Sequence, residues 1–139
     1  MMKIAVRYFS RTGNTKKLAE AIAKAVGVEA VEVSAPMLEK ADLVFLGSSV
    51  YAAGVDSAVR NFMEDNNYRI GKLVNFSTAA LLSSTYDQVK KIAELNDIEV
   101  AEEEFHCRGS FAFLHRGRPN EEDLAEAAAF ARRVVGFKA

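Results

Sequence analysis

Short apolar runs alternate with amphipathic segments along the chain, and each type predicts a different element. Residues 3–9 carry Ile4, Val6 and Tyr8 and then break into polar turn residues, which is typical of a buried strand. In residues 16–26 the apolar side chains recur every three or four positions, which predicts a helix with one buried face. On these criteria we expect strands at residues 3–9, 28–33, 43–46, 73–76 and, in two pieces, 98–100 and 104–107, and helices at 16–26, 56–63, 86–95 and from 120 onward.

Several of the expected helix ends carry local signals. Gly27 stands where the end of a helix favours a residue with positive φ. Thr85 and Gln88 have the spacing of a capping box at the start of the 86–95 helix. Asn120 precedes a first turn with three acidic residues, which suits both an N-cap and the helix dipole.

The alternation of strands and helices predicts a parallel, doubly wound α/β sheet covered by helices on both faces. One connection is unusually short. Only residues 34–41, with Pro36 among them, separate the second and third strands, whereas a crossover between parallel strands normally needs a dozen or more residues. We therefore expect at most one helical turn there. Because no repeat, low-complexity stretch or linker interrupts the pattern, we expect a single domain over residues 1–139.

Composition narrows the possible functions. The chain has 139 residues, of which 50% are hydrophobic and 27% charged, so it has enough apolar residues to form a core and is not intrinsically disordered. Its formal net charge of −1 argues against nucleic acid as the main partner. A single cysteine excludes an internal disulfide, and no apolar stretch is long enough to span a membrane. We expect a cytoplasmic protein.

Ligands of open α/β sheets bind beyond the carboxyl ends of the strands, where the strand order reverses. Three segments are expected to lie there as loops: Ser10–Thr15, Ser48–Gly54 and Ser77–Thr85. All three are rich in hydroxyls and small residues, and Arg11 is the exception to their near lack of charge. This composition favours a flat, largely neutral ligand with an anionic tail.

The first of these loops gives the sharpest signal. A strand that runs into Ser-Arg-Thr-Gly-Asn-Thr and then a helix places backbone N–H groups at a helix N-terminus, which is an anion site. Ser10, Thr12, Thr15 and Asn14 can add side-chain donors, and Gly13 permits close approach of the backbone. The phosphate motifs of nucleotide hydrolases and of dinucleotide folds do not occur in the chain. From the residues alone, a turn that merely caps the helix stays an alternative.

Phe9-Ser10-Arg11-Thr12-Gly13-Asn14-Thr15 resembles the flavodoxin fingerprint, Ser/Thr-x-Thr-Gly-Asn-Thr, which binds the phosphate of FMN. Residues 46–51 and 76–80 resemble the second and third flavin-binding segments of that family, and the resemblance covers nearly the whole chain. It implies the flavodoxin-like strand order 2-1-3-4-5 in three α/β/α layers, and non-covalent FMN. The cofactor-binding residues that it implies are Ser10, Arg11, Thr12, Gly13, Asn14, Thr15, Ser48, Ser49, Val50, Tyr51, Ala52, Ser77, Thr78, Ala79 and Ala80.

The chain also departs from the flavodoxin pattern. It has no Trp, so Tyr51 would have to stack on the flavin in the second segment. Ala52 follows where flavodoxins commonly have Gly, and a backbone flip to positive φ at Ala costs about 1–2 kcal/mol, which predicts a poorly stabilised half-reduced flavin. Leu82 stands near the place of the usual second stacking Tyr, and the acidic residues that normally surround the flavin are missing. An open flavin face would admit a substrate.

Three functions follow as alternatives. The first is an electron-transfer flavoprotein that exchanges electrons with redox partner proteins or small acceptors. The second is an FMN-dependent NAD(P)H/quinone-type reductase. The third is a flavodoxin-fold module that binds no flavin and acts through protein contacts.

Cys107 beside His106 invites a metal or nucleophile interpretation. Adjacent residues on a strand point to opposite faces, so these two side chains are not expected to converge on one ion. A buried cysteine is the favoured interpretation, and a redox thiol is the alternative. The following segment, residues 108–118, either covers the flavin or packs on the edge of the sheet.

Overall fold

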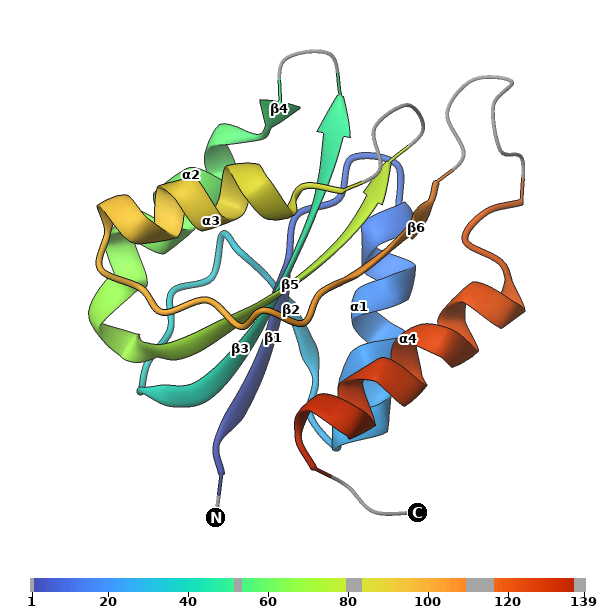
Figure 1. Ribbon diagram of the computed structural model, residues 1–139, viewed down its shortest axis with the longest axis horizontal. Coiled ribbons are helices and arrows are strands. Elements are labelled where there is room, and N and C mark those ends of the chain that lie inside the picture. Colours follow the sequence, from blue (N-terminus) through green and yellow to red (C-terminus); the bar gives the residue numbers. More distant parts are fainter. Residues whose placement is uncertain (1, 52–53, 80–83, 110–116, 137–139) are drawn as a thin grey trace.

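The computed structural model describes residues 2–51, 54–79, 84–109 and 117–136, and at residues 50, 51 and 54 it describes the backbone only. Five strands form a parallel sheet in the order β2-β1-β3-β5-β6, and a short strand β4 pairs antiparallel with β3. The strands are β1 (Ile4–Tyr8), β2 (Ala30–Glu32), β3 (Ala41–Tyr51), β4 (Gly54–Val55), β5 (Ile70–Ala79) and β6 (Phe105–Arg108). The predicted parallel sheet and its 2-1-3-4-5 order, counted over the parallel strands, are confirmed (Figure 1).

Helices cover both faces of this sheet (Figure 1). Helices α1 (Asn14–Val26) and α4 (Glu121–Val134) lie on one face, and α2 (Ser57–Asn66) and α3 (Tyr86–Leu95) lie on the other, with a 3₁₀ turn η1 (Asn67–Arg69) after α2. Each face has its own apolar core. Phe45, Phe76 and Phe130 are central to the α1–α4 side, and Leu46, Met63 and Leu73 to the α2–α3 side. Because β3 and β5 contribute side chains to both cores, they read as continuous apolar runs in the sequence.

The two central strands are longer than their apolar runs predict. We expected β3 to end at residue 46 and β5 at residue 76, with hydroxyl-rich loops beyond, but the strands continue to Tyr51 and Ala79. Ser48, Ser77 and Thr78 are therefore buried strand residues. Their hydroxyls are satisfied inside the protein: Ser48 Oγ donates to Thr85 Oγ1 at 3.0 Å and Ser77 Oγ accepts from the Thr85 N–H at 3.3 Å. These bonds let polar residues extend a buried strand.

The predicted helix bounds are confirmed in part: α2 continues to Asn66 instead of ending at residue 63, and α1 begins at Asn14 instead of residue 16. Helix α3 spans the predicted residues, and α1 ends at a Gly27 with φ +79°. The expected capping box of α3 is wrong: Thr85 makes no side-chain cap, and Gln88 Oε1 accepts from the Val55 N–H at 2.9 Å instead. Since Val55 belongs to β4, a strand that the sequence did not predict, this competing partner was not visible locally.

The short crossover between β2 and β3 contains no helix in the part of the chain that the structure describes. Arg7, on β1, binds the end of β2 and the crossover. Its guanidinium donates to the main-chain carbonyls of Glu32, Ala35 and Pro36 and lies 5.8 Å from the centroid of the Phe62 ring. Burial lowers the pKa of Arg7. These contacts hold in place a connection that has no helix to pack on the sheet.

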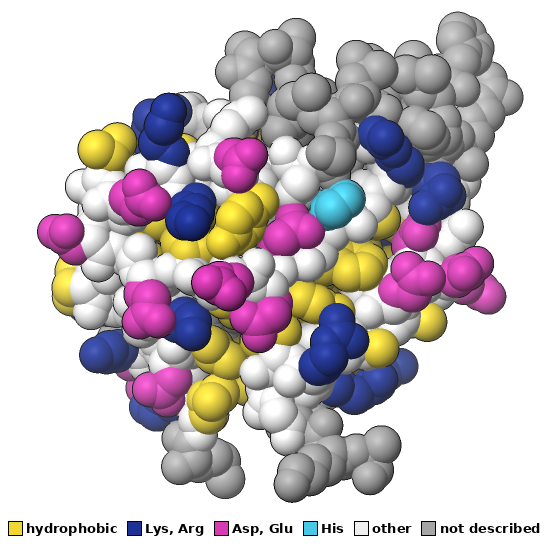
Figure 2. Space-filling view, in the orientation of Figure 1, with side chains coloured by type: hydrophobic (Ala, Val, Ile, Leu, Met, Phe, Trp, Pro, Cys, Tyr) yellow, Lys and Arg dark blue, Asp and Glu magenta, His cyan; other side chains and the backbone are white. Residues whose placement is uncertain are grey.

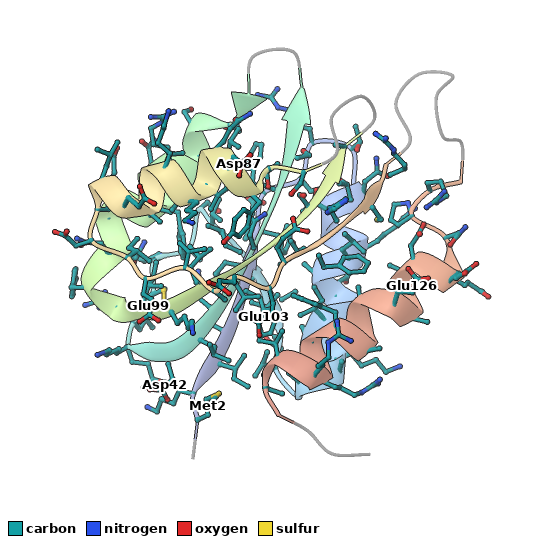
Figure 3. The ribbon with its side chains drawn as sticks, viewed as in Figure 1. Met2, Asp42, Asp87, Glu99, Glu103 and Glu126 are labelled. Carbon is teal, nitrogen blue, oxygen red and sulfur yellow. The ribbon has the colours of Figure 1, made fainter. Side chains whose placement is uncertain are left out.

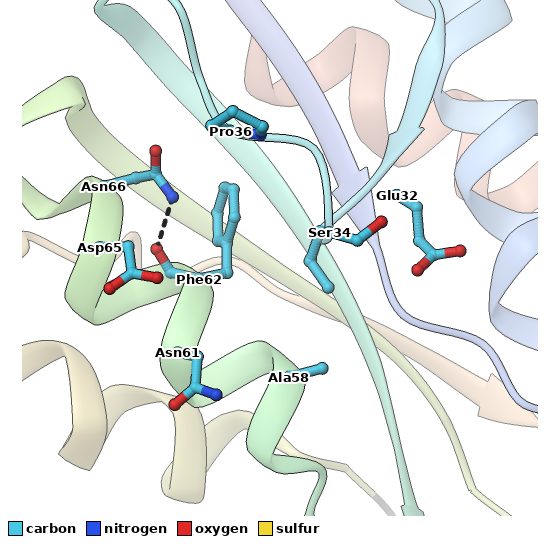
Figure 4. A pocket seen from close by; sticks show the side chains of 9 residues that line it. Glu32, Ser34, Pro36, Ala58, Asn61, Phe62, Asp65 and Asn66 are labelled. Carbon is cyan, nitrogen blue, oxygen red and sulfur yellow. Dashed lines mark hydrogen bonds between the residues drawn. The ribbon is translucent and has the colours of Figure 1, made fainter.

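A cavity of about 280 Å³ lies between this crossover and α2 (Figure 4). Its lining mixes apolar and polar side chains, and the ring of Phe62 extends toward Pro36. Asn66, on the wall of the cavity, is fully engaged: it accepts from the Met37 N–H at 3.1 Å and donates to the Phe62 carbonyl at 2.9 Å. The cavity thus lies between α2 and the shortened crossover, with residues of both in its wall.

Candidate functional site

The first predicted segment forms a tight turn between β1 and α1. The Phe9 N–H donates to the carbonyl of Gly47 at 3.1 Å, which fixes the end of β1 beside β3. Ser10 Oγ then accepts from the Gly13 N–H at 3.0 Å and closes the turn. Gly13 has φ +92° at the N-cap of α1, a conformation that L-residues rarely adopt, and the space around its Cα is open. The turn therefore requires a glycine at position 13, because of the positive φ there.

Gly13, the N-cap residue of α1, has no side chain with which to cap the helix, and the first turn of α1 contains no acidic residue. Lys16 and Lys17 lie exposed in that turn, on the unfavourable end of the helix dipole. The first N–H groups of a helix have no partner within the helix, so this end can accept an external anion. The anion site that the sequence predicts at this helix end stays a prediction.

The first segment, the end of β5 and the residue that follows β6 come together at Asn14 and Thr15, which are both buried. Thr15 Oγ1 and Thr78 Oγ1 lie 2.9 Å apart and share a hydrogen bond between α1 and β5. A Cβ atom on Gly109 would lie 3.0 Å from Asn14 Nδ2 and 3.1 Å from Thr78 Cβ. A side chain at Gly109 would therefore press on the first segment. Gly109 was not predicted as a site residue, because Thr78 and Asn14 lie 31 and 95 positions away in the sequence. The available signal was a glycine shortly after an expected strand.

The second and third predicted segments lie next to each other in the sheet. Ser48 pairs with Ser77, Ser49 with Thr78 and Val50 with Ala79 in the register of β3 and β5. Tyr51 ends β3, where its backbone pairs with Gly54 of β4. The structure thus brings together the predicted residues of β3 and β5. Ala52 and Ala80, and with Ala52 the prediction about the half-reduced flavin, lie outside the described residues, as does Leu82.

The hydroxyls of these two segments converge on Thr85, at the start of α3. Thr85 Oγ1 accepts from Ser48 Oγ and from Asn75 Nδ2, each at 3.0 Å. Its backbone N–H donates to Ser77 Oγ. The sequence analysis placed Thr85 at the end of the third segment but did not foresee this role. The network fixes β3, β5 and the end of the third segment relative to one another.

Arg11 forms an ion pair with Asp56, from Nη2 to Oδ2 at 2.5 Å. Both residues lie beyond the carboxyl ends of the strands, Arg11 in the first segment and Asp56 at the N-cap of α2. The pKa of Asp56 is lowered, first by the hydrogen bond that its carboxylate accepts from the Ala58 N–H and then by the hydrogen bond from Arg11. The structure therefore pairs Arg11 with a protein carboxylate, and the contact with FMN that the resemblance implies for Arg11 stays a prediction.

Cys107 and His106 point to opposite faces of β6, as the strand geometry predicted. Cys107 packs on the α1–α4 core, and burial, with a further contribution from Asp123, raises the pKa of its thiol to about 12. His106 lies on the other face, with Nδ1 2.7 Å from Glu104 Oε2. Among the described residues, no three His, Cys, Asp or Glu side chains come together as a possible metal site. A thiol with so high a pKa is a poor nucleophile at neutral pH.

Charge of neither sign dominates the visible surface. Figure 2 shows acidic and basic side chains interspersed over the face that carries α3, β6 and α4. Asp42 and Glu99, labelled in Figure 3, lie toward the amino ends of the strands, away from the candidate site. Near the carboxyl ends, Asp56 pairs with Arg11 and Glu104 with His106. No described helix is long and apolar enough to cross a membrane.

The sheet order, the uncapped turn at α1 and the paired segments of β3 and β5 together define a flavodoxin-like fold. A family model described as a flavodoxin domain matches residues 5–106, and the chain belongs to this family. An uncharacterised protein of Methanocaldococcus jannaschii is 27% identical over 149 aligned positions, which cover 96% of this chain and 99% of that protein.

Solved structures show the same fold. A flavodoxin from the domain Archaea superposes with a TM-score of 0.78 at 18% identity and covers 97% of each chain. Oxidised flavodoxin 1 from Bacillus cereus superposes with a TM-score of 0.71 at 18% identity and covers 99% of each chain. The shared fold therefore extends over nearly the full length of the described protein.

Proposed function

We propose that this protein binds FMN non-covalently at the carboxyl edge of its sheet and transfers electrons through it. The observation that supports this most directly is the first segment, where the fingerprint residues form a turn that leaves the N-terminus of α1 without a side-chain cap. Its backbone N–H groups suit a phosphate. FMN would supply the redox chemistry, and the protein would bind and orient it.

Each segment has a distinct part in this proposal. Thr12 is exposed beside the uncapped helix end, and Gly13 gives the turn its shape. Thr15 ties the phosphate segment to β5 through Thr78, and Asn14 lies beside Gly109, which follows β6. The ends of β3 and β5, held by Thr85, would carry the segments that contact the flavin ring. Redox partner proteins or small electron acceptors in the cytoplasm would exchange electrons with it.

A reductase of small acceptors is the second candidate, and the charge distribution favours keeping it. Carboxylates at the site of a dedicated carrier would give an unpaired negative field that steers basic partners. Here Asp56 is paired with Arg11, and Glu104 Oε2 lies 2.7 Å from His106 Nδ1. Steady-state oxidation of NAD(P)H with a quinone as acceptor distinguishes the reductase from the carrier. A flavodoxin-fold module that binds no flavin remains the third candidate.

The test is an absorption spectrum of the protein after incubation with FMN and desalting. Bound flavin bands support the proposal, and a colourless protein that remains folded contradicts it and favours the third candidate. The double variant Thr12→Ala/Asn14→Ala should abolish FMN retention because it removes two fingerprint side chains. Asn61→Ala, on the exposed side of α2, is the matched control and should retain FMN. Unchanged retention in the double variant contradicts the assignment of the site.

A further inference from the structure

The two carboxylate oxygens of Asp56 serve two different parts of the chain. Oδ1 accepts from the Ala58 N–H at 2.9 Å and caps α2. Oδ2 accepts from Arg11 Nη2 at 2.5 Å, across 45 positions of sequence. The side chain of Asp56 is only 16% exposed, whereas that of Arg11 is 59% exposed. Asp56 is thus a fixed anchor at the start of α2, and Arg11 reaches it from the first segment.

Asp56 directly follows β4, the short strand that turns back on the end of β3 (Figure 1). This hairpin is small, with only Val50–Val55 and Tyr51–Gly54 as paired positions. Such a short antiparallel pair has little stability of its own. Side chains hold it from two directions: Gln88 of α3 accepts from the Val55 N–H, and Arg11 of the first segment binds Asp56. Contacts from other elements therefore set its position.

Arg11 belongs to the segment that the proposed function assigns to the FMN phosphate. Its guanidinium carbon lies 5.8 Å from the centroid of the Phe9 ring, in the same turn that Ser10 and Gly13 close. The ion pair therefore joins the turn at α1 directly to the hairpin that ends β3.

We propose that Arg11 and Asp56 form a latch between the phosphate segment and the β3–β4 hairpin, and that this latch slows the release of FMN. The inference rests on the proposed function. Arg11 is a positioning residue in this scheme: it acts on the flavin through Asp56 and the hairpin. When the latch opens, the hairpin and the first segment can separate, and the cofactor leaves faster.

Asp56→Asn tests the latch specifically. Asn is as good an N-cap as Asp, so the bond to the Ala58 N–H is kept while the charge that binds Arg11 is lost. If the latch slows release, FMN should dissociate from Asp56→Asn about fivefold faster than from the wild type, because a partly exposed ion pair contributes about 1 kcal/mol. Flavin fluorescence after dilution measures the two release rates. Arg11→Gln should show the same increase, and the double variant should show no more than either single variant.

The opposite outcome has a definite meaning. If Arg11 instead binds the phosphate directly, Asp56→Asn frees it for that contact, and release slows or stays unchanged while Arg11→Gln still accelerates it. That result overturns the latch. Glu39→Gln is the matched control, because it breaks the Lys3–Glu39 pair on the remote surface, and it should leave the release rate unchanged.

A measurement without flavin separates failure of the latch from failure of the proposed function. If the wild-type protein takes up no FMN, the proposed function fails, but amide hydrogen exchange at Val55 still tests the fastening of the hairpin. Asp56→Asn should increase that exchange severalfold in the flavin-free protein while the amides of β5 keep their protection. Unchanged exchange at Val55 overturns the latch.

Discussion

The first turns of α1 and α4 are opposites. Helix α4 begins with a complete capping box, in which Asn120 Oδ1 accepts from the Asp123 N–H at 2.9 Å and Asp123 Oδ2 accepts from the Asn120 N–H at 2.8 Å. Helix α1 begins at Gly13 with no side-chain cap. At the third helical position, α4 has the carboxylate Asp123 and α1 has the cation Lys16.

The contrast shows which helix N-terminus has its charge and hydrogen bonds satisfied by the protein alone. At α4, Arg118 adds a bidentate pair to Asp123, with oxygen–nitrogen distances of 2.6 and 2.8 Å, so charge and hydrogen bonds are satisfied within the protein. At α1, Lys16 and Lys17 oppose the helix dipole, by about 0.3–1 kcal/mol each. An anion at α1 would remove that penalty. The protein stabilises α4 by itself and leaves α1 suited to an anionic ligand.

Breaking the capping interactions at the N-terminus of α4 has the largest expected effect on stability. Asp123→Asn removes the charged acceptor of Arg118 and weakens the capping box, so the free energy of unfolding should fall by about 2 kcal/mol. Urea unfolding measures this. FMN retention should stay unchanged, because the variant leaves α1 intact; a large loss of FMN would show that the two helix ends are not independent.

The pH dependence of stability should follow the same carboxylate. The pKa of Asp123 is held below its ordinary value of 3.8, first by the hydrogen bond from Arg118 and also by the N–H of Asn120. A lowered pKa means that the folded state binds its proton less readily than the unfolded chain does. The stabilisation is therefore present above the ordinary pKa and is lost as pH falls through the folded value. Unfolding measured from pH 6 to pH 3 should show a smaller loss in Asp123→Asn than in the wild type.

Gly13→Ala should disturb the open end through backbone conformation alone. The space around Gly13 is free, so the cost of about 1–2 kcal/mol arises from forcing φ +92° on an L-residue. Gly27→Ala is a matched control, with φ +79° and equally free space at the other end of the same helix. Both variants should lose similar stability in urea, but only Gly13→Ala should weaken FMN binding. Equal FMN affinity in the two variants would contradict the assigned role of the turn.

Making the first turn of α1 resemble that of α4 should have the smallest effect on stability, and it should stabilise the protein where the variants above destabilise it. Lys16→Asp copies the residue that α4 has at the same helical position, and it should stabilise the flavin-free protein by about 0.5–1 kcal/mol. The same change should weaken FMN binding, because a carboxylate would face the phosphate. Lys16→Gln, which only removes the cation, should lie between wild type and Lys16→Asp in both measurements. An FMN affinity that rises in Lys16→Asp would place the phosphate elsewhere.

Features encoded within one turn of chain were predictable from the sequence. The bounds of α3, the end of α1 at Gly27 and the start of α4 at Asn120 follow from the spacing of apolar residues and from side chains that bond three positions away. The fingerprint of the first segment is local in the same sense. The parallel sheet followed as well, since strands alternating with helices have few other arrangements.

Features that depend on a distant partner were not predictable. Ser48 looked like a loop residue because its acceptor, Thr85, lies 37 positions away. Gln88 looked like half of a capping box, but it accepts from Val55, 33 positions away. Strand β4 was missed because two residues carry no periodicity. For Ser48 and Gln88, the hydrogen-bond partner lies far away in the sequence and could not be inferred from neighbouring residues.

The sequence by itself therefore determined the fold class and the turn with Gly13 at the start of α1, because both follow from patterns of neighbouring residues. Only the tertiary structure decided how far β3 and β5 extend, that Arg11 reaches Asp56, and that Gly109 approaches Asn14. The physical reason is that a hydrogen bond or a close contact between distant segments depends on their relative placement. That placement comes from packing on the two faces of the sheet.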